Sequence, residues 1–299
     1  MPRKPKPFTD INHSMVWRVG EREIDLAERG LIMGILNITP DSFSDGGQWM
    51  DPEKAAAHAF EMEAEGASII DIGGESTRPG AAAVSTENEL ARVIPVIQAI
   101  RAQSEVLISV DTSKAAVARA ALDAGAEIIN DVTGLQGDPA MLETARQCDA
   151  GLVVMHMKGD PRTMQKAPTY GNVVEDVAGF FAERQARTTA AGILAERILF
   201  DPGIGFGKEL EHNLALLRHL DRLSPEERPL LIGVSRKAFI GRVLGSTDLE
   251  DRYWATVALT SYTRERGARV FRVHDVLPNA QALRMTEAIL LAPGDRPAG

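Results

Sequence analysis

Short apolar runs that end in polar residues recur eight times along the chain, and a loop and a helical pattern follow each run. Strands that read as continuous apolar runs between helices are typical of a parallel sheet that is buried on both faces. Eight such units predict an α/β fold, a single closed (β/α)8 or TIM barrel, with its chemistry at the carboxyl ends of the strands. The runs cover residues 31–37, 69–75, 107–111, 128–131, 152–156, 198–201, 230–235 and 270–274.

The same pattern divides the chain into three segments, of which only one is large enough to be a domain. Residues 1–30 are predicted to be an N-terminal arm or hairpin, residues 31–291 the barrel, and residues 292–299 a flexible tail. Within the arm, residues 17–24 can pair as a short hairpin with Gly20 near its turn. We expect this hairpin to close the bottom of the barrel.

Polar residues mark where several helices begin. Asp51 followed by Pro52 is typical of a helix cap with proline in the first turn, and Ser85 is expected to cap the next helix. The third helix is expected to open at residues 112–113. The longest helical pattern covers residues 172–192.

Composition and charge agree with one globular domain. The 299 residues are 44% hydrophobic and 5% aromatic, which suits an aliphatic barrel core. A formal net charge of −9 argues against a nucleic-acid surface, although a local basic patch could still bind an anion. The lone Cys148 fits a reducing compartment. Residues 1–8 lack the apolar core of a secretion signal, and no apolar run is long enough to span a membrane. We expect a soluble cytoplasmic protein.

Two loops at the expected mouth of the barrel are long and rich in Gly, Pro and short polar residues. They cover residues 38–47 and 76–80, with small residues after the second. Loops of this kind beside a barrel mouth are typical of mobile lids. The alternative is that both are ordinary connections.

Carboxylate and amide side chains lie at or just beyond three strand ends. Asp111, Asp131 and Asp201 can accept hydrogen bonds, and Asn130 can both donate and accept them. This combination suits recognition of the polar edge of a flat heterocycle. For Asp131, a role as a helix cap remains equally consistent with the sequence.

A second group of strand-end residues is cationic. Arg272 and His274 are two residues apart on one predicted strand, so they face the same side, and Lys237 follows the preceding strand. Barrels often bind phosphate near their last two strands, and these residue types favour an anion site there. The alternative for His274 is a core histidine paired with Asp275.

Several other chemistries fit the sequence poorly. The chain has no Walker-type loop, no Cys/His cluster for zinc and no Gly-x-Ser-x-Gly elbow. The glycines at residues 203–207 lack dinucleotide-binding spacing and favour a tight loop near a ligand. A metal would therefore be hard and oxygen-bound, and Mg²⁺ held largely by substrate phosphates fits an anion site of this kind.

Seven segments together resemble the signature sequences of the dihydropteroate synthase family. The first two segments are highly specific as a pair, whereas the third alone would be a weak signal. All seven occur in family order, and the likeness covers nearly the whole chain from Leu31 to about Leu291. The segments are residues 34–47, 71–80, 109–112, 129–131, 201–207, 235–237 and 272–275.

The resemblance implies a transferase of folate biosynthesis that joins p-aminobenzoate to 6-hydroxymethyl-7,8-dihydropterin diphosphate, releasing pyrophosphate and giving 7,8-dihydropteroate. It also implies Mg²⁺, a homodimer formed through the later helices, and a sulfonamide target. The implied pterin diphosphate-binding residues are Thr77, Asp111, Asn130, Met155, Asp201, Lys237, Arg272 and His274. The p-aminobenzoate site would be shaped by Thr77, Pro79, Phe206 and Ser235, with residues 40–43 closing over it. Asn37 is implied to bind Mg²⁺, and Asp41, Asp111 and Lys237 to be catalytic.

Two other functions remain to be weighed against this one. A methyltetrahydrofolate-dependent methyltransferase is a related pterin-binding barrel, but it needs no diphosphate-binding group and no Thr-Pro-Asp-Ser-Phe-Ser loop. A catalytically silent pterin-binding or scaffold protein would bind pterin without turnover. The complete loop and cationic segments argue against both. Pyrophosphate release in the presence of p-aminobenzoate separates the synthase from the other two.

Overall fold

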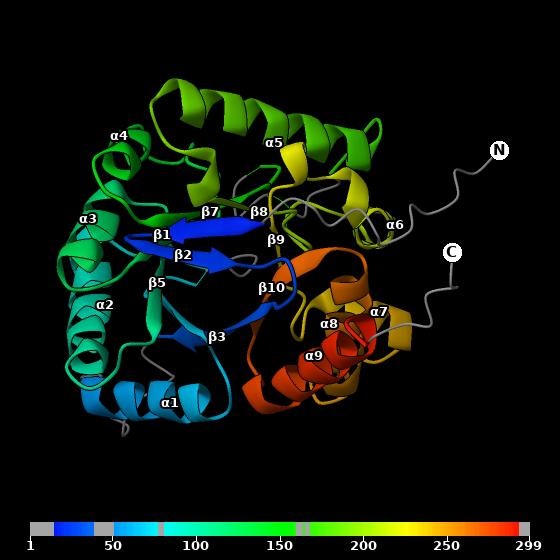
Figure 1. Cartoon of the computed structure of the whole chain (residues 1–299), viewed down its shortest axis with the longest axis horizontal. Coiled ribbons are helices and arrows are strands. Elements are labelled where there is room, and N and C mark those ends of the chain that lie inside the picture. The colour runs from blue at the N-terminus through cyan, green and yellow to red at the C-terminus, as the bar shows by residue number, and fades with distance from the viewer. Residues whose placement is uncertain (1–14, 39–50, 77–80, 160–163, 165–167, 293–299) are drawn as a thin grey trace.

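Eight parallel strands form a closed barrel in the computed structural model, which describes residues 15–38, 51–76, 81–159, 164 and 168–292 (Figure 1). The order around the barrel is β10-β3-β4-β5-β6-β7-β8-β9, so neighbours along the chain are neighbours in space. The predicted fold class is therefore confirmed. The strands are β3 (Leu31–Asn37), β4 (Ile69–Gly73), β5 (Leu107–Asp111), β6 (Ile128–Asp131), β7 (Gly151–Met155), β8 (Ile198–Asp201), β9 (Leu230–Ile232) and β10 (Ala268–Val273).

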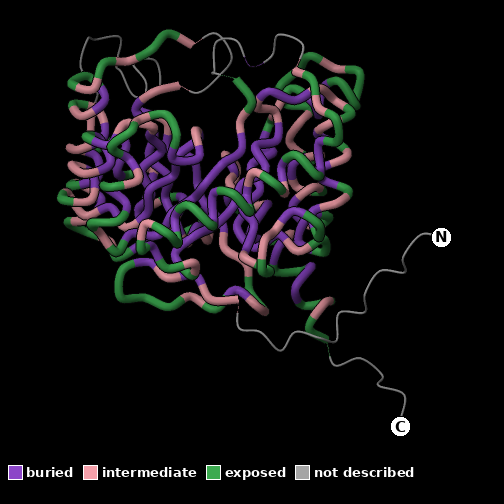
Figure 2. Tube along the Cα trace, turned by 90° about the horizontal axis from the view of Figure 1, so that it is seen from above, coloured by how far each residue is buried: buried purple, intermediate pink, exposed green. Residues whose placement is uncertain are grey.

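Helices surround the barrel and cover the outward faces of its strands (Figures 1 and 2). The helix between β7 and β8 is the longest described, as predicted, and two helices rather than one connect β9 to β10. The α-helices are α1 (Pro52–Ala64), α2 (Thr86–Arg101), α3 (Ala115–Asp123), α4 (Met141–Arg146), α5 (Val173–Ala190), α6 (Leu210–Arg218), α7 (Ala238–Leu244), α8 (Arg252–Glu265) and α9 (Val276–Leu290). The short 3-10 helices are η1 (Ala195–Arg197), η2 (Leu220–Arg222) and η3 (Pro225–Glu227).

Two of the three predicted helix starts are confirmed. The side chains of Asp51 and Ser85 accept hydrogen bonds from backbone amides in the first turns of α1 and α2. The third prediction is wrong, because α3 begins at Ala115 and not at residues 112–113. Asp138, from the next β/α unit, accepts the hydrogen bond of the Ala115 amide at 2.9 Å. A cap supplied from another unit leaves no local sequence signal.

The predicted N-terminal hairpin is present and closes the amino-terminal end of the barrel. It pairs β1 (Val16–Val19) with β2 (Arg22–Asp25) in antiparallel register. Trp17 is fully buried, and its Nε1 donates to the Arg197 carbonyl at 3.0 Å. Together with Val19 and Leu26 it packs on an apolar layer that takes one residue from each barrel strand: Met33, Ile69, Leu107, Ile128, Val153, Leu199, Leu231 and Val270.

The inside of the barrel changes from apolar to polar along the strands. Side chains alternate between the two faces of a strand, so the residues two positions beyond the apolar layer also point inward. These include three charged side chains, Asp71, Asp201 and Arg272, and none of the three belongs to the apolar cluster. The polar half of the barrel lies at the carboxyl ends of the strands, where this fold places its chemistry.

Among the residues that the structure describes, no helix is both long and apolar enough to cross a membrane.

Candidate active site

Four strand-end residues lie in one row across adjacent strands at the barrel mouth. The strand register pairs Asn37 with Gly73, Gly73 with Asp111, and Asp111 with Asn130. A methyl group on Gly73 would lie 3.6 Å from Asp111 Cβ and 3.7 Å from Asn37 Oδ1. Both distances are ordinary van der Waals contacts, so Asn37 and Asp111 lie on either side of Gly73. The row therefore places Asn37, predicted to bind metal, at the same edge of the barrel as Asp111 and Asn130, predicted to bind the pterin.

Arg272 joins this row to a carboxylate that sequence reasoning did not single out. Its Nε donates to Asp71 Oδ2 at 2.6 Å, and its Nη2 donates to Asp111 Oδ2 at 2.8 Å. Asn130 Nδ2 lies 3.2 Å from Asp71 Oδ2, and Asp71 is fully buried. Burial lowers the pKa of Arg272, but the two carboxylates outweigh it and raise the pKa above its ordinary value. A charged residue inside the apolar run 69–73 was the available signal for Asp71.

Asp111 has one oxygen that no described protein group satisfies. Its Oδ1 is buried without a hydrogen-bond partner, and so is the hydroxyl of Ser109, two residues earlier on the same face of β5. Burial raises the pKa of Asp111 to about 7, with Arg272 opposing the rise and Asp71 adding to it. Buried acceptors are normally paired, so this oxygen points to a ligand that donates hydrogen bonds.

The opposite side of the mouth carries a second carboxylate and an ammonium group. Asp201 pairs in register with Met155, and its Oδ1 accepts from the Gly203 amide at 2.7 Å. Burial raises the pKa of Asp201, and the charge of Lys237 opposes that rise. Burial also lowers the pKa of Lys237 to about 8, against the attraction of Asp201. On this side of the mouth, burial disfavours the charged form of both groups, and the attraction between Asp201 and Lys237 favours it.

The loop after β8 holds the Lys237 side chain. Lys237 Nζ donates to the Ile204 carbonyl at 2.6 Å and lies 4.7 Å from the centre of the Phe206 ring. A cation over an aromatic face is attracted to it. The structure thus brings Phe206, predicted for the p-aminobenzoate site, beside Lys237, predicted for the pterin site.

Ser235 and His274 lie together at the end of the last strands. His274 Nδ1 is 2.9 Å from Ser235 Oγ, and the His274 amide donates to the same hydroxyl at 3.2 Å. Asp275, the other partner considered for His274, accepts hydrogen bonds from Arg236. Ser235 itself lies beyond β9, which ends three residues earlier than the apolar run suggested. The predicted cationic group is therefore divided: Arg272 points to the carboxylates, while His274 lies by Ser235.

Asp131 accepts hydrogen bonds from the turn that follows β6 and does not cap a helix, because α4 begins only at Met141. Its Oδ1 accepts from the amide and the hydroxyl of Thr133 at 2.8 and 2.7 Å, and its Oδ2 accepts from the Leu135 amide at 3.1 Å. Burial raises the pKa of Asp131 to about 6, with these hydrogen bonds opposing the rise. Both carboxylate oxygens accept hydrogen bonds and thereby fix the start of the β6–α4 connection.

Some predicted site residues lie outside the described part of the chain: Asp41 and the rest of residues 40–43, Thr77 and Pro79. For metal binding, no group of three or more His, Cys, Asp or Glu side chains gathers among the described residues. The side-chain oxygen of Asn37 is the kind of ligand that Mg²⁺ uses when phosphates supply most of its other ligands.

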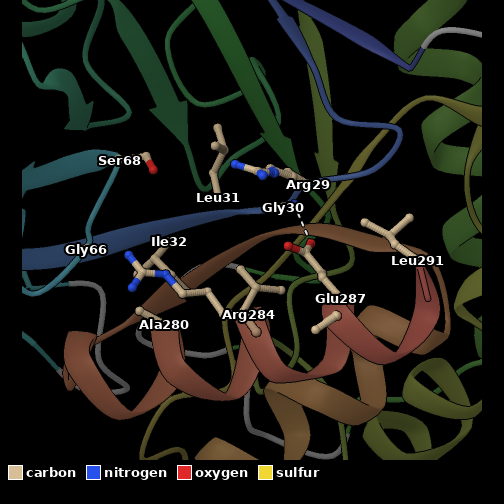
Figure 3. Close-up of a pocket in the computed structure, with 12 residues that line it drawn as sticks. Arg29, Gly30, Leu31, Ile32, Gly66, Ser68, Ala280, Arg284, Glu287 and Leu291 are labelled. Carbon is tan, nitrogen blue, oxygen red and sulfur yellow. Dashed lines mark hydrogen bonds between the residues drawn. The ribbon is translucent and has the colours of Figure 1, made fainter. Parts of the chain in front are cut away.

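A separate cavity of about 580 Å³ lies at the other end of the barrel, between the start of β3 and α9 (Figure 3). Its lining includes Gly30 and Glu287. Glu287 already accepts from the Gly30 amide at 2.6 Å and from Arg264 Nε at 2.7 Å. Because this carboxylate ties α9 to the barrel, we assign it a structural role and place the chemistry at the strand carboxyl ends.

Comparison with known proteins agrees with this placement. The profile of the pterin binding enzyme family matches residues 33–274. Dihydropteroate synthase of Escherichia coli is 49% identical over 261 residues, which cover 87% of this chain and 92% of that protein. A Yersinia pestis dihydropteroate synthase, solved as a sulfonamide drug complex, superposes with a TM-score of 0.86 at 45% identity, covering 92% and 99% of the two chains. A Xanthomonas albilineans dihydropteroate synthase with 4-aminobenzoic acid gives a TM-score of 0.87 at 44% identity, covering 94% and 100%.

Proposed function

The chain belongs to the pterin-binding enzyme family, and we propose that it catalyses the dihydropteroate synthase reaction. In that reaction, 6-hydroxymethyl-7,8-dihydropterin diphosphate and p-aminobenzoate condense to 7,8-dihydropteroate and pyrophosphate. The chain is then a transferase of folate biosynthesis. Near-half identity to a named synthase over most of both chains, together with the polar barrel mouth, supports this assignment.

The unsatisfied Oδ1 of Asp111 is the single observation that carries the proposal. A pterin edge presents ring nitrogens and an exocyclic amine, which donate to carboxylates and accept from amides. Asp111 and Asn130 are neighbours in register, and Met155 and Asp201 are neighbours on the next pair of strands. We assign Asp111, Asn130, Asp201 and Lys237 to the polar edge of the ring and Met155 to its face.

The diphosphate is assigned to the part of the mouth where β10 ends. Arg272, His274 and Thr77 are proposed to contact it, and Asn37 to contribute an oxygen to Mg²⁺. The register supports this assignment, since Asn37 and Asp111 lie on the two strands beside Gly73 and both carry side-chain oxygens at the barrel mouth. When bound, Mg²⁺ would offset the negative charge that develops on the leaving pyrophosphate.

The proposed mechanism is dissociative. The bond between the pterin methylene carbon and the diphosphate oxygen breaks first, its electron pair leaves with pyrophosphate, and positive charge spreads over the pterin ring. Arg272 and His274 would stabilise the leaving group, and Asp111 would stabilise the ring cation. The amine of p-aminobenzoate then attacks the methylene carbon and loses a proton. No protein nucleophile is needed, which accounts for the absence of nucleophile motifs from the sequence.

The p-aminobenzoate site is assigned to the rim. Phe206 and Ser235 are proposed to line it together with Thr77 and Pro79, and residues 40–43, with Asp41 as a catalytic residue, to close over it. Closure would exclude water, which would otherwise capture the cation. The occupation of this site by sulfonamides is proposed by analogy with the Yersinia pestis relative.

We also propose a cytoplasmic homodimer. Large apolar side chains are exposed on the later helices, including Val243 on α7, Trp254 on α8, and Met285 and Ile289 on α9. Trp254 is 73% exposed, and large apolar patches on a surface are typical of protein–protein contacts. A second copy of the chain would cover this surface.

An assay for pyrophosphate with and without p-aminobenzoate tests the proposed function. We expect pyrophosphate release from the dihydropterin diphosphate that depends on both p-aminobenzoate and Mg²⁺. Methyl transfer from methyltetrahydrofolate without such release would favour the methyltransferase. Calorimetric pterin binding with no product over hours would favour the silent binding protein.

A further inference from the structure

Lys208 is a buried lysine that the proposed reaction does not use. It follows the glycine-rich loop after β8 and is only 3% exposed. Its Nζ donates to the carbonyl oxygens of Gly203 and Phe206 at 3.0 Å each and of His156 at 3.2 Å. His156 Nδ1 lies 3.0 Å from the same nitrogen. An ammonium group has three protons, so these four acceptors use its full donor capacity.

The two strand ends that Lys208 joins are packed backbone against backbone. Gly203 has a positive φ of 63°, and a Cβ there would overlap the His156 carbonyl oxygen. Carbonyl oxygens from the end of β7 and from the loop after β8 therefore converge on one point. Each buried carbonyl left without a donor would cost about 1–3 kcal/mol. Lys208 supplies the donors that this close approach needs.

His156 contributes an uncharged, tightly packed imidazole ring on the β7 side of Lys208. Burial, with the charge of Lys208 adding to it, lowers the pKa of His156 to about 3, so the ring is neutral and its Nδ1 can accept. The ring also packs edge-on against Phe180, with centroids 5.0 Å apart. The loop after β8 is thus tied to a fixed aromatic group on the β7 side.

The other side of the same loop holds Lys237. The Ile204 carbonyl, next to that of Gly203, accepts from Lys237 Nζ at 2.6 Å, and the Phe206 ring lies beneath it. We propose that Lys208 is a positioning residue for the pterin site. It holds the loop in the one shape that presents the Ile204 carbonyl and the Phe206 ring to Lys237. This inference rests on the proposed function, because it assigns Lys208 to the binding of the pterin substrate.

A double-mutant cycle tests the proposal. Lys208→Met, Lys237→Met and the double variant are purified, and binding of the dihydropterin diphosphate to each is measured by calorimetry without p-aminobenzoate. We expect Lys208→Met to weaken binding about tenfold, the scale of a lost charged hydrogen bond. In the Lys237→Met background, the same change should weaken binding less than about twofold, because the side chain through which Lys208 acts is gone.

Lys158→Met is the matched control. Lys158 is an exposed lysine beside the same loop, and its Nζ donates to the Thr169 carbonyl and lies over the Tyr170 ring. Its removal should leave binding unchanged. If Lys208→Met fails to fold, Asn213→Ala replaces it in the cycle, because Asn213 Oδ1 accepts from the Gly205 amide at 2.7 Å and holds the same loop.

The outcomes separate this proposal from the proposed function. If the wild-type chain binds the pterin diphosphate and Lys208→Met weakens binding equally in both backgrounds, the positioning role alone is overturned. Unchanged binding by Lys208→Met would overturn it as well. A folded wild-type chain that neither binds nor converts the pterin diphosphate would overturn the proposed function and this role together.

Discussion

At the scale of single residues, two buried carboxylates at the barrel mouth share one guanidinium group. Arg272 is shared between Asp71 and Asp111, so one positive charge serves two buried carboxylates. Burial raises the pKa of Asp111 to about 7, and the charge of Arg272 only partly opposes this rise. Across the mouth, burial lowers the pKa of Lys237 to about 8. Both groups therefore titrate near neutral pH, and their charge states become experimentally accessible.

The pH profile of kcat/KM for the pterin diphosphate should be bell-shaped. Ionised Asp111 is lost as the pH falls below about 7, and protonated Lys237 is lost as the pH rises above about 8. Activity should therefore be highest between these values. Steady-state rates from pH 5.5 to 9.5 measure this, and a constant kcat/KM from pH 6 to pH 9 would contradict the assigned charge states.

Asp71→Asn tests whether the buried carboxylate organises the site. Removing one partner of a buried ion pair leaves Arg272 under-compensated, and the free energy of unfolding should fall by about 3 kcal/mol. KM for the pterin diphosphate should rise, because Asn130 and Arg272 both contact Asp71. Urea unfolding and steady-state kinetics measure the two effects. Glu143→Gln, which breaks an exposed pair with Arg146, should cost less than about 1 kcal/mol; equal losses in both variants would contradict the role of Asp71.

At the scale of elements, periodicity predicted the strands well because each one is a short apolar run that is buried on both faces. The hairpin was predictable from Trp17, an aromatic residue in a short segment that flanks a glycine turn. The start of α3 was not, because Asp138 lies in another unit and caps the helix only after folding. Asp71 could have been noticed as a charge within an apolar strand. Its partners could not, since they come from β6 and β10.

Trp17→Ala tests the contribution of the hairpin to the barrel. The fully buried indole packs on the apolar layer at the amino-terminal end, so we expect a loss of about 3–5 kcal/mol in the free energy of unfolding. Because the site lies at the opposite end, kcat/KM of the folded fraction should change little. Guanidinium unfolding provides the measurement. Glu23→Ala, an exposed position on β2, is the control, and a Trp17→Ala loss no larger than the control's would contradict the predicted packing.

At the scale of the whole molecule, the closed order of strands was predictable, but the register between them was not. Counting units gives eight strands, and the alternation of side chains gives which residues point inward. The stagger of each strand against the next decides that Asp111 lies beside Asn130 and that Arg272 reaches Asp71. That stagger follows from closing the barrel, and no local segment encodes it.

Trp254→Glu tests the proposed homodimer. A carboxylate in place of the exposed indole would be buried without a partner at the interface, so the variant should be monomeric while each subunit stays folded. Light scattering at micromolar concentration and circular dichroism measure assembly and folding. A wild-type chain that is already monomeric, or a variant that still dimerises, would contradict the proposed surface.

The most direct test of the account is the formation of 7,8-dihydropteroate, identified by chromatography, from the purified chain with both substrates and Mg²⁺. The account predicts product from the wild type, a loss of at least about a hundredfold in Asp111→Asn, and wild-type rates in Asp123→Asn, an exposed carboxylate at the end of α3. No product from a folded wild-type chain, or wild-type rates in Asp111→Asn, would contradict it.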